Sequence, residues 1–284
     1  MRSVCDSGHT EARGTVPGVA RRRIDTLLAE RGLVPSRARG AEAVRAGRVR
    51  IGRGGARAEK PSQLVGPDEE LRVDPAPRYV SRGGLKLERG LDELGIRVGG
   101  RDCLDVGAST GGFTDCLLQR GAARVVAVDV GQGQLDWRLR TDERVVVLER
   151  TNARDLDTAR LPFRPDLATV DVSFVGLSKV LPPVAACVAP AGEILALVKP
   201  QFELGPREVG KGGVVRDPAS RRLAILSVAE AATRLALRVR GVAASGLPGP
   251  KGNRESFLWL AYEGPAVADV EAEARWVEPD EDSA

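Results

Sequence analysis

The chain has 284 residues, 42% of them hydrophobic, and a formal net charge of +4. This length and hydrophobic content suffice to bury a substantial core, and they favour one main domain with a smaller one. Glycines and prolines lie between periodic segments without forming a repeat, which excludes collagen-like and low-complexity proteins. No apolar stretch approaches the roughly 18 residues that cross a bilayer, and residues 1–20 lack the apolar centre of a secretion signal. We therefore expect a cytoplasmic globular protein without a membrane partner.

The single histidine and the four cysteines exclude several kinds of site. The cysteines form no CxxC pair, and His9 lies in a polar leader at residues 1–20 that we expect to be disordered. This pattern argues against a metal site, and we expect the cysteines to be small buried hydrophobic residues. A general base in the core must then be Lys, Asp, Glu or Tyr, which excludes most Ser-His-Asp and Cys-His mechanisms.

Positive charge is concentrated near the beginning of the chain. Residues 21–60 contain twelve Arg or Lys and four Asp or Glu, whereas the remainder is slightly acidic. A basic block at one end of a near-neutral protein is typical of contact with nucleic acid or an anionic surface. A solvated charged face remains the alternative.

Two short helices and a strand are predicted within residues 21–51. Ile24, Leu27 and Leu28 have helical spacing before Gly32, and Ser36 is a good N-cap for a second helix. The pattern resembles the small RNA-binding domain named after ribosomal protein S-four over about fifty residues. The resemblance implies that the outward basic residues bind RNA: Arg22, Arg37, Arg39, Arg45, Arg48 and Arg50.

Composition also suggests the domain boundaries. We expect the basic domain at residues 21–76 and a Pro-stiffened linker at 77–84, with the boundary near residue 77. The larger domain then covers residues 85–264. Residues 265–284 are rich in acids, and we expect them to form a mobile tail.

The larger domain alternates strands and helices. Apolar strands are predicted at 102–107, 124–130, 145–149, 166–172 and 193–198, with helical segments between them and a late strand pair near 238–244 and 256–262. This alternation indicates an α/β fold with a doubly wound, mostly parallel sheet. The late pair suggests an antiparallel seventh strand, the usual finish of methyltransferase sheets.

The sequence GASTGG follows the first of these strands, at residues 107–112, and three cofactors compete for it. A phosphate loop needs Lys after the last glycine, and none follows Gly112. The dinucleotide fingerprint needs glycine where Ser109 stands. S-adenosylmethionine needs only a tight turn and backbone amides near its carboxylate. We therefore expect S-adenosylmethionine to bind the loop and the start of the next helix: Gly107, Ala108, Ser109, Thr110, Gly111, Gly112, Phe113 and Thr114.

Two polar residues farther along complete the predicted cofactor site. Asp129 ends the next strand, where its carboxylate can accept both ribose hydroxyls. NAD and S-adenosylmethionine use such an acid alike, so Asp129 does not distinguish them. Asn152 follows the third strand, and we expect it to meet the adenine edge.

Charged residues at other strand ends are candidates for the chemistry, because ligands bind at that edge of such sheets. Lys86 precedes the first strand, Asp171 and Lys199 end the fourth and fifth, and Glu255 precedes the last. Taken singly, each has a structural alternative as a cap, an ion-pair partner or a solvated charge.

Together these four residues resemble the Lys-Asp-Lys-Glu tetrad of ribose 2′-O-methyltransferases. The resemblance implies a site that polarises a sugar hydroxyl, which is too weak an acid to ionise at neutral pH. Burial and a neighbouring cation can turn a lysine into a base, and we expect Lys199 in that role, although Lys86 could exchange with it. Asp171 would orient the Lys199 amine, and Lys86 with Glu255 would position the ribose.

Residues 21–262 as a whole resemble the TlyA family of rRNA 2′-O-methyltransferases, which are also named hemolysins. The resemblance rests on RYVSRGGLKL, LDVGASTGGFTDCLL, VDVGQGQL, ERTNAR, LVKPQFE, GGVVRDP and LPGPKGNRESFLWL. It implies an FtsJ-like, Rossmann-like class I domain that methylates cytidine ribose in 16S or 23S rRNA, or both, within ribosomal subunits, with no obligate protein partner. Residues 78–82 match the segment thought to link RNA docking to cofactor binding, so Arg82 joins the expected RNA-binding residues. The leader and the acidic tail depart from the family pattern, as does Ser109-Thr110.

Two other functions remain open. A membrane-damaging hemolysin would need an amphipathic or spanning segment, and the sequence has neither a secretion signal nor a long apolar run. A non-catalytic RNA-binding assembly factor would predict a broken tetrad or a blocked glycine loop, and neither is seen.

Overall fold

The computed structural model describes residues 20–205, 207–210 and 212–280 and divides the chain into two compact units after Pro77. The predicted leader therefore lies outside the described residues, apart from residue 20. The predicted linker at 77–84 is too long. Tyr79 is buried in the core of the second unit, and the Val80 amide donates to Asp115 Oδ2 at 2.8 Å. The next helix already begins at Arg82, behind the N-cap Ser81.

The first unit packs two helices against short strands. Ile24, Leu28 and Val44 are buried in its core, and the Ser36 hydroxyl accepts from the Arg39 amide, which confirms the predicted N-cap. The strands form a pair β1-β4 and a three-stranded sheet β3-β2-β5. The elements are β1 (Arg22–Arg23), α1 (Ile24–Glu30), α2 (Arg37–Arg45), β2 (Val49–Ile51), β3 (Ala56–Arg57), β4 (Leu64–Val65) and β5 (Leu71–Val73).

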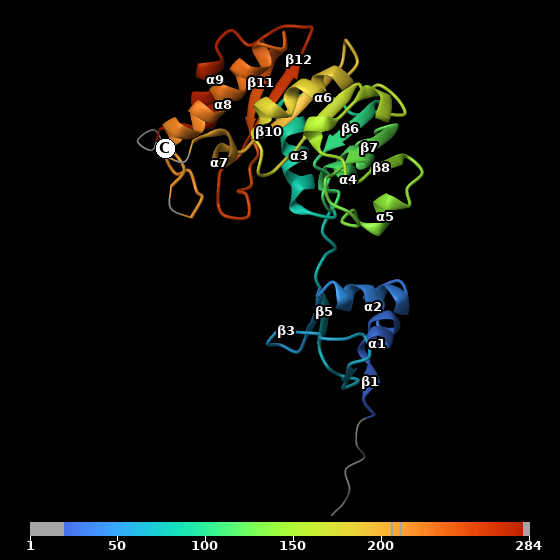
Figure 1. Ribbon diagram of the computed structural model, residues 1–284. Helices are drawn as coiled ribbons and strands as arrows, with labels where there is room; N and C mark the ends of the chain where they lie inside the picture. Colours follow the sequence, from blue (N-terminus) through green and yellow to red (C-terminus); the bar gives the residue numbers. More distant parts are fainter. Residues whose placement is uncertain (1–19, 206, 211, 281–284) are drawn as a thin grey trace, which may run out of the picture. The chain divides into compact units, whose positions relative to one another are not determined.

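The second unit is built on a seven-stranded sheet, in agreement with the predicted α/β fold (Figure 1). The strand order is β11-β12-β10-β9-β6-β7-β8, and β12 alone runs antiparallel to its neighbours. The strands are β6 (Asp102–Val106), β7 (Arg124–Val128), β8 (Val145–Leu148), β9 (Leu167–Val170), β10 (Glu193–Val198), β11 (Arg238–Ala244) and β12 (Ser256–Ala261).

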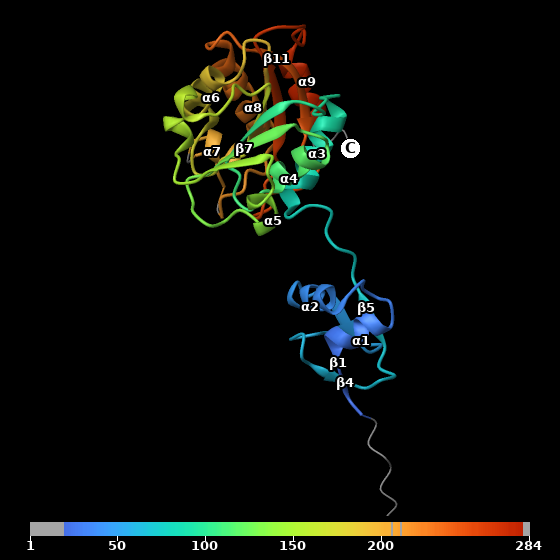
Figure 2. The same cartoon turned by 90° about the vertical axis from the view of Figure 1, so that its right-hand side faces the viewer.

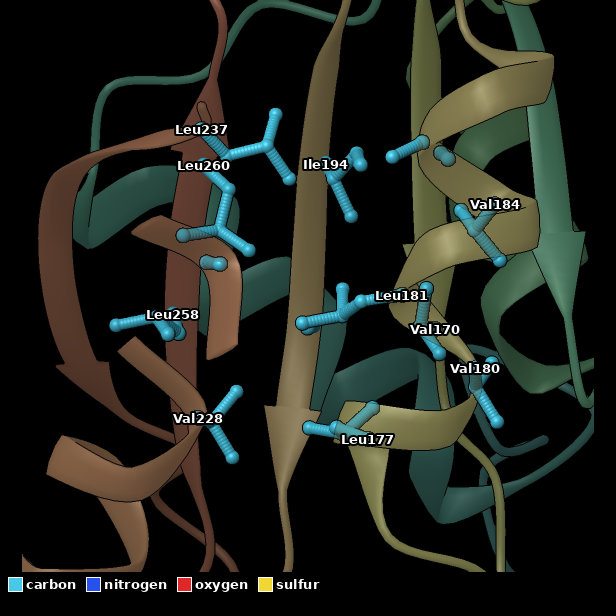
Figure 3. Close-up of a cluster of buried hydrophobic side chains, with 14 of the residues drawn as sticks. Val170, Leu177, Val180, Leu181, Val184, Ile194, Val228, Leu237, Leu258 and Leu260 are labelled. Atoms are coloured by element: carbon cyan, nitrogen blue, oxygen red, sulfur yellow. The ribbon is translucent and has the colours of Figure 1, made fainter. Parts of the chain in front are cut away.

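Helices cover both faces of this sheet (Figure 2). One face packs against α3 (Arg82–Glu93), α4 (Gly112–Gln119) and α5 (Trp137–Arg140). The other packs against α6 (Leu181–Cys187), α8 (Pro218–Thr233) and α9 (Val270–Val277). On that second face Ile194 and Leu260 of the sheet lie among helix residues such as Val184 and Val228 (Figure 3). The remaining elements are η1 (Ala153–Asp155), η2 (Thr158–Arg160), η3 (Leu177–Lys179) and α7 (Pro200–Glu203).

The prediction of a mobile acidic tail at 265–284 is wrong for the part that the structure describes. Ala274 and Val277 of α9 are buried in the sheet's second core layer. Glu278 is also buried, and its Oε2 accepts from Arg221 Nε of α8 at 2.6 Å. The acids of this segment dominate its composition, but its apolar positions form one helix face, so the helix is part of the core.

Candidate active site

The site lies at the topological switch point of the sheet, where successive strands begin to be added on the other side of β6. From β6 the chain runs outward through β7 and β8, then crosses to β9 and β10 on the other side. Ligands of such sheets bind outside the carboxyl ends of the strands at this point. Gly107 follows β6 with φ +90°, and a Cβ there would lie 2.4 Å from the carbonyl oxygen of Asp171 after β9. Only glycine fits this close approach of the two strand ends.

A pocket of about 430 Å³ opens at this edge of the second unit. It brings together all four predicted catalytic residues and most of the predicted glycine loop. Its lining residues are Ser81, Arg82, Gly83, Lys86, Gly107, Ala108, Ser109, Thr110, Gly112, Phe113, Asp171, Ser173, Lys199, Pro248, Pro250 and Glu255. Of the other two loop residues predicted, Gly111 has φ +95° and caps α4, and Thr114 is buried beneath the loop.

The four charged residues form two separate ion pairs. Lys86 Nζ lies 2.5 Å from Glu255 Oε2, and the two side chains are 9% and 2% exposed. Lys199 Nζ lies 2.5 Å from Asp171 Oδ1, with side chains 12% and 25% exposed, and donates to Ser173 Oγ at 3.1 Å. Each lysine thus faces one carboxylate, as buried charges require. The Lys199–Asp171 pair is the more open of the two to a substrate.

Asp129 holds the glycine loop from the next strand end. Its Oδ2 accepts from the Ser109 amide at 2.8 Å, and its Oδ1 accepts from the Gly131 amide at 2.7 Å. A carboxylate has about four acceptor positions, so Asp129 retains capacity for ribose hydroxyls. A hollow beside it, lined also by Gln134 and Glu149, measures only about 10 Å³.

These residues fit S-adenosylmethionine. The large pocket offers loop amides and a side-chain-free Gly107 at one end, and Asp129 lies beyond Ser109 at the other. Ser109 Oγ and Gln134 Oε1 lie 3.5 Å apart over the smaller hollow. An adenosine would therefore have to displace the Gln134 side chain.

Asn152 does not reach either cavity, so its predicted contact with adenine is not supported by the geometry. Its Oδ1 accepts from the backbone amide of Arg154 at 3.1 Å and caps η1. β8 ends at Leu148, and Arg150, with φ +52°, turns the chain before Asn152 is reached. Glu149, one residue after β8, lines the smaller hollow instead.

Asp105 is a buried acid that the sequence reasoning missed. It lies in β6, is 0% exposed, and accepts from Thr114 Oγ1 at 2.7 Å and Thr169 Oγ1 at 3.3 Å. Burial raises the pKa of Asp105 to about 7, against the opposing effect of the Thr114 hydrogen bond. The residue ties β6, α4 and β9 together beneath the glycine loop. An acid within the otherwise apolar stretch CLDV was the available signal.

Phe174 was also missed. It comes three residues after Asp171, is 92% exposed, and has φ +65°, an uncommon conformation for a residue other than glycine. Its ring centroid lies 5.3 Å from that of Phe202. An exposed aromatic next to the pocket residue Ser173 offers a surface for stacking.

The arginines predicted to bind RNA, Arg82 included, lie wholly or partly at the surface. Arg22, Arg37, Arg39 and Arg50 pair with acids of the first unit while their side chains stay 40% or more exposed. Arg45 is exposed, and Arg48 donates to the Asp74 carbonyl at 3.1 Å. Arg82 lines the pocket of the second unit and donates to the Pro248 carbonyl at 2.8 Å.

Comparison with known proteins agrees with this architecture. The chain matches the FtsJ-like methyltransferase family over residues 79–262 and the S4 domain over residues 22–71. The 16S/23S rRNA (cytidine-2'-O)-methyltransferase TlyA of Mycobacterium tuberculosis is 52% identical over 242 residues, 84% of this chain and 90% of the relative. The 23S rRNA (cytidine-2'-O)-methyltransferase TlyA of Campylobacter jejuni is 35% identical over 207 residues, 70% of this chain and 80% of the relative.

A solved structure points the same way. A protein from Streptococcus thermophilus described as a hemolysin is 36% identical and superposes with a TM-score of 0.68, covering 92% of this chain and 96% of its own. Within the described ranges, this chain has no helix of the length and apolarity that a membrane crossing requires.

A seven-stranded sheet with a glycine loop after its first strand and an acid after its second defines a Rossmann-like methyltransferase. The chain belongs to the FtsJ-like methyltransferase family, and its identity to the mycobacterial protein places it in the TlyA family within it.

Proposed function

We propose that this protein uses S-adenosylmethionine to methylate the ribose 2′-oxygen of cytidine in ribosomal RNA, of the 16S type, the 23S type or both. The observation that carries the proposal is the pocket at the β6 and β9 ends, which holds two lysine–carboxylate pairs next to the glycine loop. The substrate named for the relatives at 52% and 35% identity supports the choice of cytidine. A cytoplasmic location follows from this choice of substrate.

The chemistry that the side chains must supply is the activation of a weak acid. When bound, S-adenosylmethionine provides an electrophilic methyl group. We assign Lys199, as the neutral amine after it has released a proton to solvent, to accept the proton of the ribose hydroxyl as the oxygen becomes methylated. Asp171, 2.5 Å from Lys199 Nζ, stabilises the ammonium that this proton transfer creates.

The second pair has a different task in this proposal. Lys86 and Glu255 are more deeply buried than Lys199 and Asp171. They keep a fixed donor and acceptor in the same pocket, which positions the ribose in line with the methyl group.

RNA binding is divided between the two units. The exposed arginines of the first unit supply phosphate contacts, which carry affinity with little sequence information. In the second unit, Arg82 at the pocket and the exposed Phe174 ring are placed to hold the target nucleotide. Single-stranded RNA bases stack on such aromatic rings.

A non-catalytic assembly factor is the alternative function. It would tolerate loss of one member of either ion pair or a side chain filling the glycine loop. Both pairs are formed and the loop lines the pocket, which favours the enzyme.

The decisive experiment is transfer of labelled methyl from S-adenosylmethionine to separated small and large ribosomal subunits. The subunits come from cells that lack this protein, and the product nucleotide is mapped. We expect label on a cytidine 2′-oxygen and none with the Lys199→Ala variant. Intact cofactor binding without label on either subunit would contradict the proposal and favour the assembly factor.

A further inference from the structure

The loop that carries Asp171 is joined to the segment after Lys199 at several points. Residues 171–177 follow β9, and α7 follows Lys199 at the end of β10. Lys199 contacts Asp171 and Ser173 at the pocket. Farther from the pocket, the rings of Phe202 and Phe174 form a tilted pair.

Glu203, the last residue of α7, makes the final link. Both of its carboxylate oxygens accept from the backbone amide of Leu177, at 3.0 and 3.1 Å. Leu177 begins η3 and is buried in the sheet's core, and the Gly176 N-cap contributes no side chain. Glu203 therefore satisfies the first amide of η3 from a different strand end.

The two segments approach each other closely at this link. A Cβ on Gly176 would lie 3.2 Å from the Phe202 carbonyl oxygen and 3.3 Å from Glu203 Oε2. Burial also raises the pKa of Glu203 to about 7, and only the Leu177 amide opposes that effect. The Glu203 carboxylate therefore joins the two segments through the single Leu177 amide.

The loop between these anchors contains a strained residue. Asp171 is fixed at the start, because its amide donates to the Val106 carbonyl at 2.9 Å, and Leu177 is fixed at the end by Glu203. Phe174, between them, has φ +65°. A non-glycine residue keeps this conformation only when its surroundings enforce it. Without Glu203, the loop after the Asp171 backbone is free to relax, which turns the Asp171 side chain and Ser173 away from Lys199.

We propose that Glu203 is a positioning residue for methyl transfer, holding the 171–177 loop so that Asp171 and Lys199 keep their alignment in the pocket. This inference rests on the proposed function. Glu203 touches neither the pocket nor the reacting atoms, so it acts through the loop alone. Its loss should lower turnover and leave cofactor binding in place, because the glycine loop and Asp129 belong to other strand ends.

The test compares Glu203→Ala with Glu203→Gln in the full chain. Methyl transfer to ribosomal subunits gives kcat and KM, and calorimetry gives the Kd for S-adenosylmethionine. We expect Glu203→Ala to lower kcat about tenfold to a hundredfold, with the cofactor Kd changed less than about twofold. Glu203→Gln should recover most of the activity, since its amide oxygen can accept the same bond.

Glu193→Ala is the matched control. Glu193 begins β10, at the opposite end from Lys199, and is a largely buried carboxylate that pairs with Arg101 and Arg240. It should lower stability while leaving kcat of the folded protein unchanged.

Each other outcome has a defined meaning. Equal kcat for Glu203→Ala and the wild-type chain would overturn the role of Glu203 and leave the proposed function standing. Equal losses in Glu203→Ala and Glu203→Gln, or a loss of cofactor binding in step with activity, would reduce Glu203 to a structural residue. If Glu203→Ala does not fold, Glu203→Asp replaces it, because its shorter side chain moves the carboxylate away from the Leu177 amide, and unchanged kinetics there would overturn the proposal. Absence of transfer by the wild-type chain would overturn both proposals.

Discussion

Ion pairs of the first unit and those in the pocket of the second unit differ in how far they are removed from water. In the first unit, the Arg39–Glu42 side chains are 64% and 52% exposed, and other pairs there are similarly open. In the pocket, the Lys86–Glu255 side chains are 9% and 2% exposed. An exposed pair contributes about 0–1 kcal/mol and exchanges easily for a phosphate, whereas breaking a buried pair costs about 3–5 kcal/mol. The same chemical groups thus provide adaptable contacts in one unit and fixed positions in the other.

The largest effect is expected from removing Lys199, because we propose that this largely buried pair also performs the chemistry. Lys199→Ala should lower methyl transfer by about 10²–10⁴-fold, the usual contribution of a general base. The Kd for S-adenosylmethionine should change little, because the glycine loop and Asp129 are intact. Single-turnover transfer with saturating cofactor measures the loss.

Lys86→Ala separates the two lysines. If the rate of methyl transfer no longer depends on pH in Lys86→Ala but still does in Lys199→Ala, the roles of the two lysines are exchanged. Full activity of Lys199→Ala would remove it as the base.

The Arg221–Glu278 pair is buried but has no role in the proposed reaction, so it tests the effect of burial on stability alone. Glu278→Ala leaves Arg221 buried without its carboxylate, and we expect a loss of about 3–5 kcal/mol of unfolding free energy. Glu271→Ala on the same helix breaks the exposed pair with Arg275 and should cost less than about 0.5 kcal/mol. Urea unfolding followed by tryptophan fluorescence reports on the second unit alone, since Trp137, Trp259 and Trp276 all lie there. Similar losses in both variants would contradict the distinction.

Asp25 is an intermediate case, because it is buried but its arginine partners are exposed. Hydrogen bonding from Arg23 lowers the pKa of Asp25 to about 2, with Arg37 adding to the effect against the penalty of burial. The folded pKa is below the unfolded value, so this stabilisation is present above about pH 4 and is lost as the pH falls toward 2. We expect Asp25→Asn to cost about 1–2 kcal/mol at pH 7 and less at pH 3. Hydrogen exchange of the first unit's core amides in the full chain measures both values; an equal cost at both pH values would mean that charge is not the cause.

Much of the second unit was predictable because a doubly wound sheet produces a regular pattern. Buried parallel strands are apolar throughout and their carboxyl ends meet at one edge. Gly107, Asp171 and Lys199 therefore had to come together once the strands were recognised. The contact between Lys86 and Glu255 could not be predicted from such a pattern, because 169 positions separate the two residues and no local pattern links them.

The error on the acidic tail arose because composition was used where the packing of individual side chains decides. Residues 265–284 are rich in acids, but Ala274 and Val277 of α9 lie on one face that docks on the core. The adenine contact of Asn152 stays a prediction; its side chain caps η1 and lines neither cavity. Glu203 and Phe174 gave no signal, because their roles depend on contacts between two strand ends.

The smallest effects are expected from the exposed arginines of the first unit. They test whether exposed ion pairs exchange for contacts with RNA phosphates. Arg39→Gln and Arg45→Gln should each reduce by about one the slope of log K against log salt for binding to ribosomal subunits. Arg234→Gln is the matched control, because Arg234 forms an exposed pair with Glu230 in the second unit, where the proposal places no phosphate contact.

Glu42→Gln provides the reverse test at the same position. Glu42 competes with phosphate for Arg39, so its neutralisation should strengthen RNA binding by about twofold to threefold, the equivalent of a surface pair worth roughly 0.5 kcal/mol. Filter binding at several salt concentrations measures this shift with the same subunits. Weaker binding in Glu42→Gln would mean that the pair holds Arg39 in its binding position, and the exposed pairs of the first unit would then resemble the fixed pairs of the pocket.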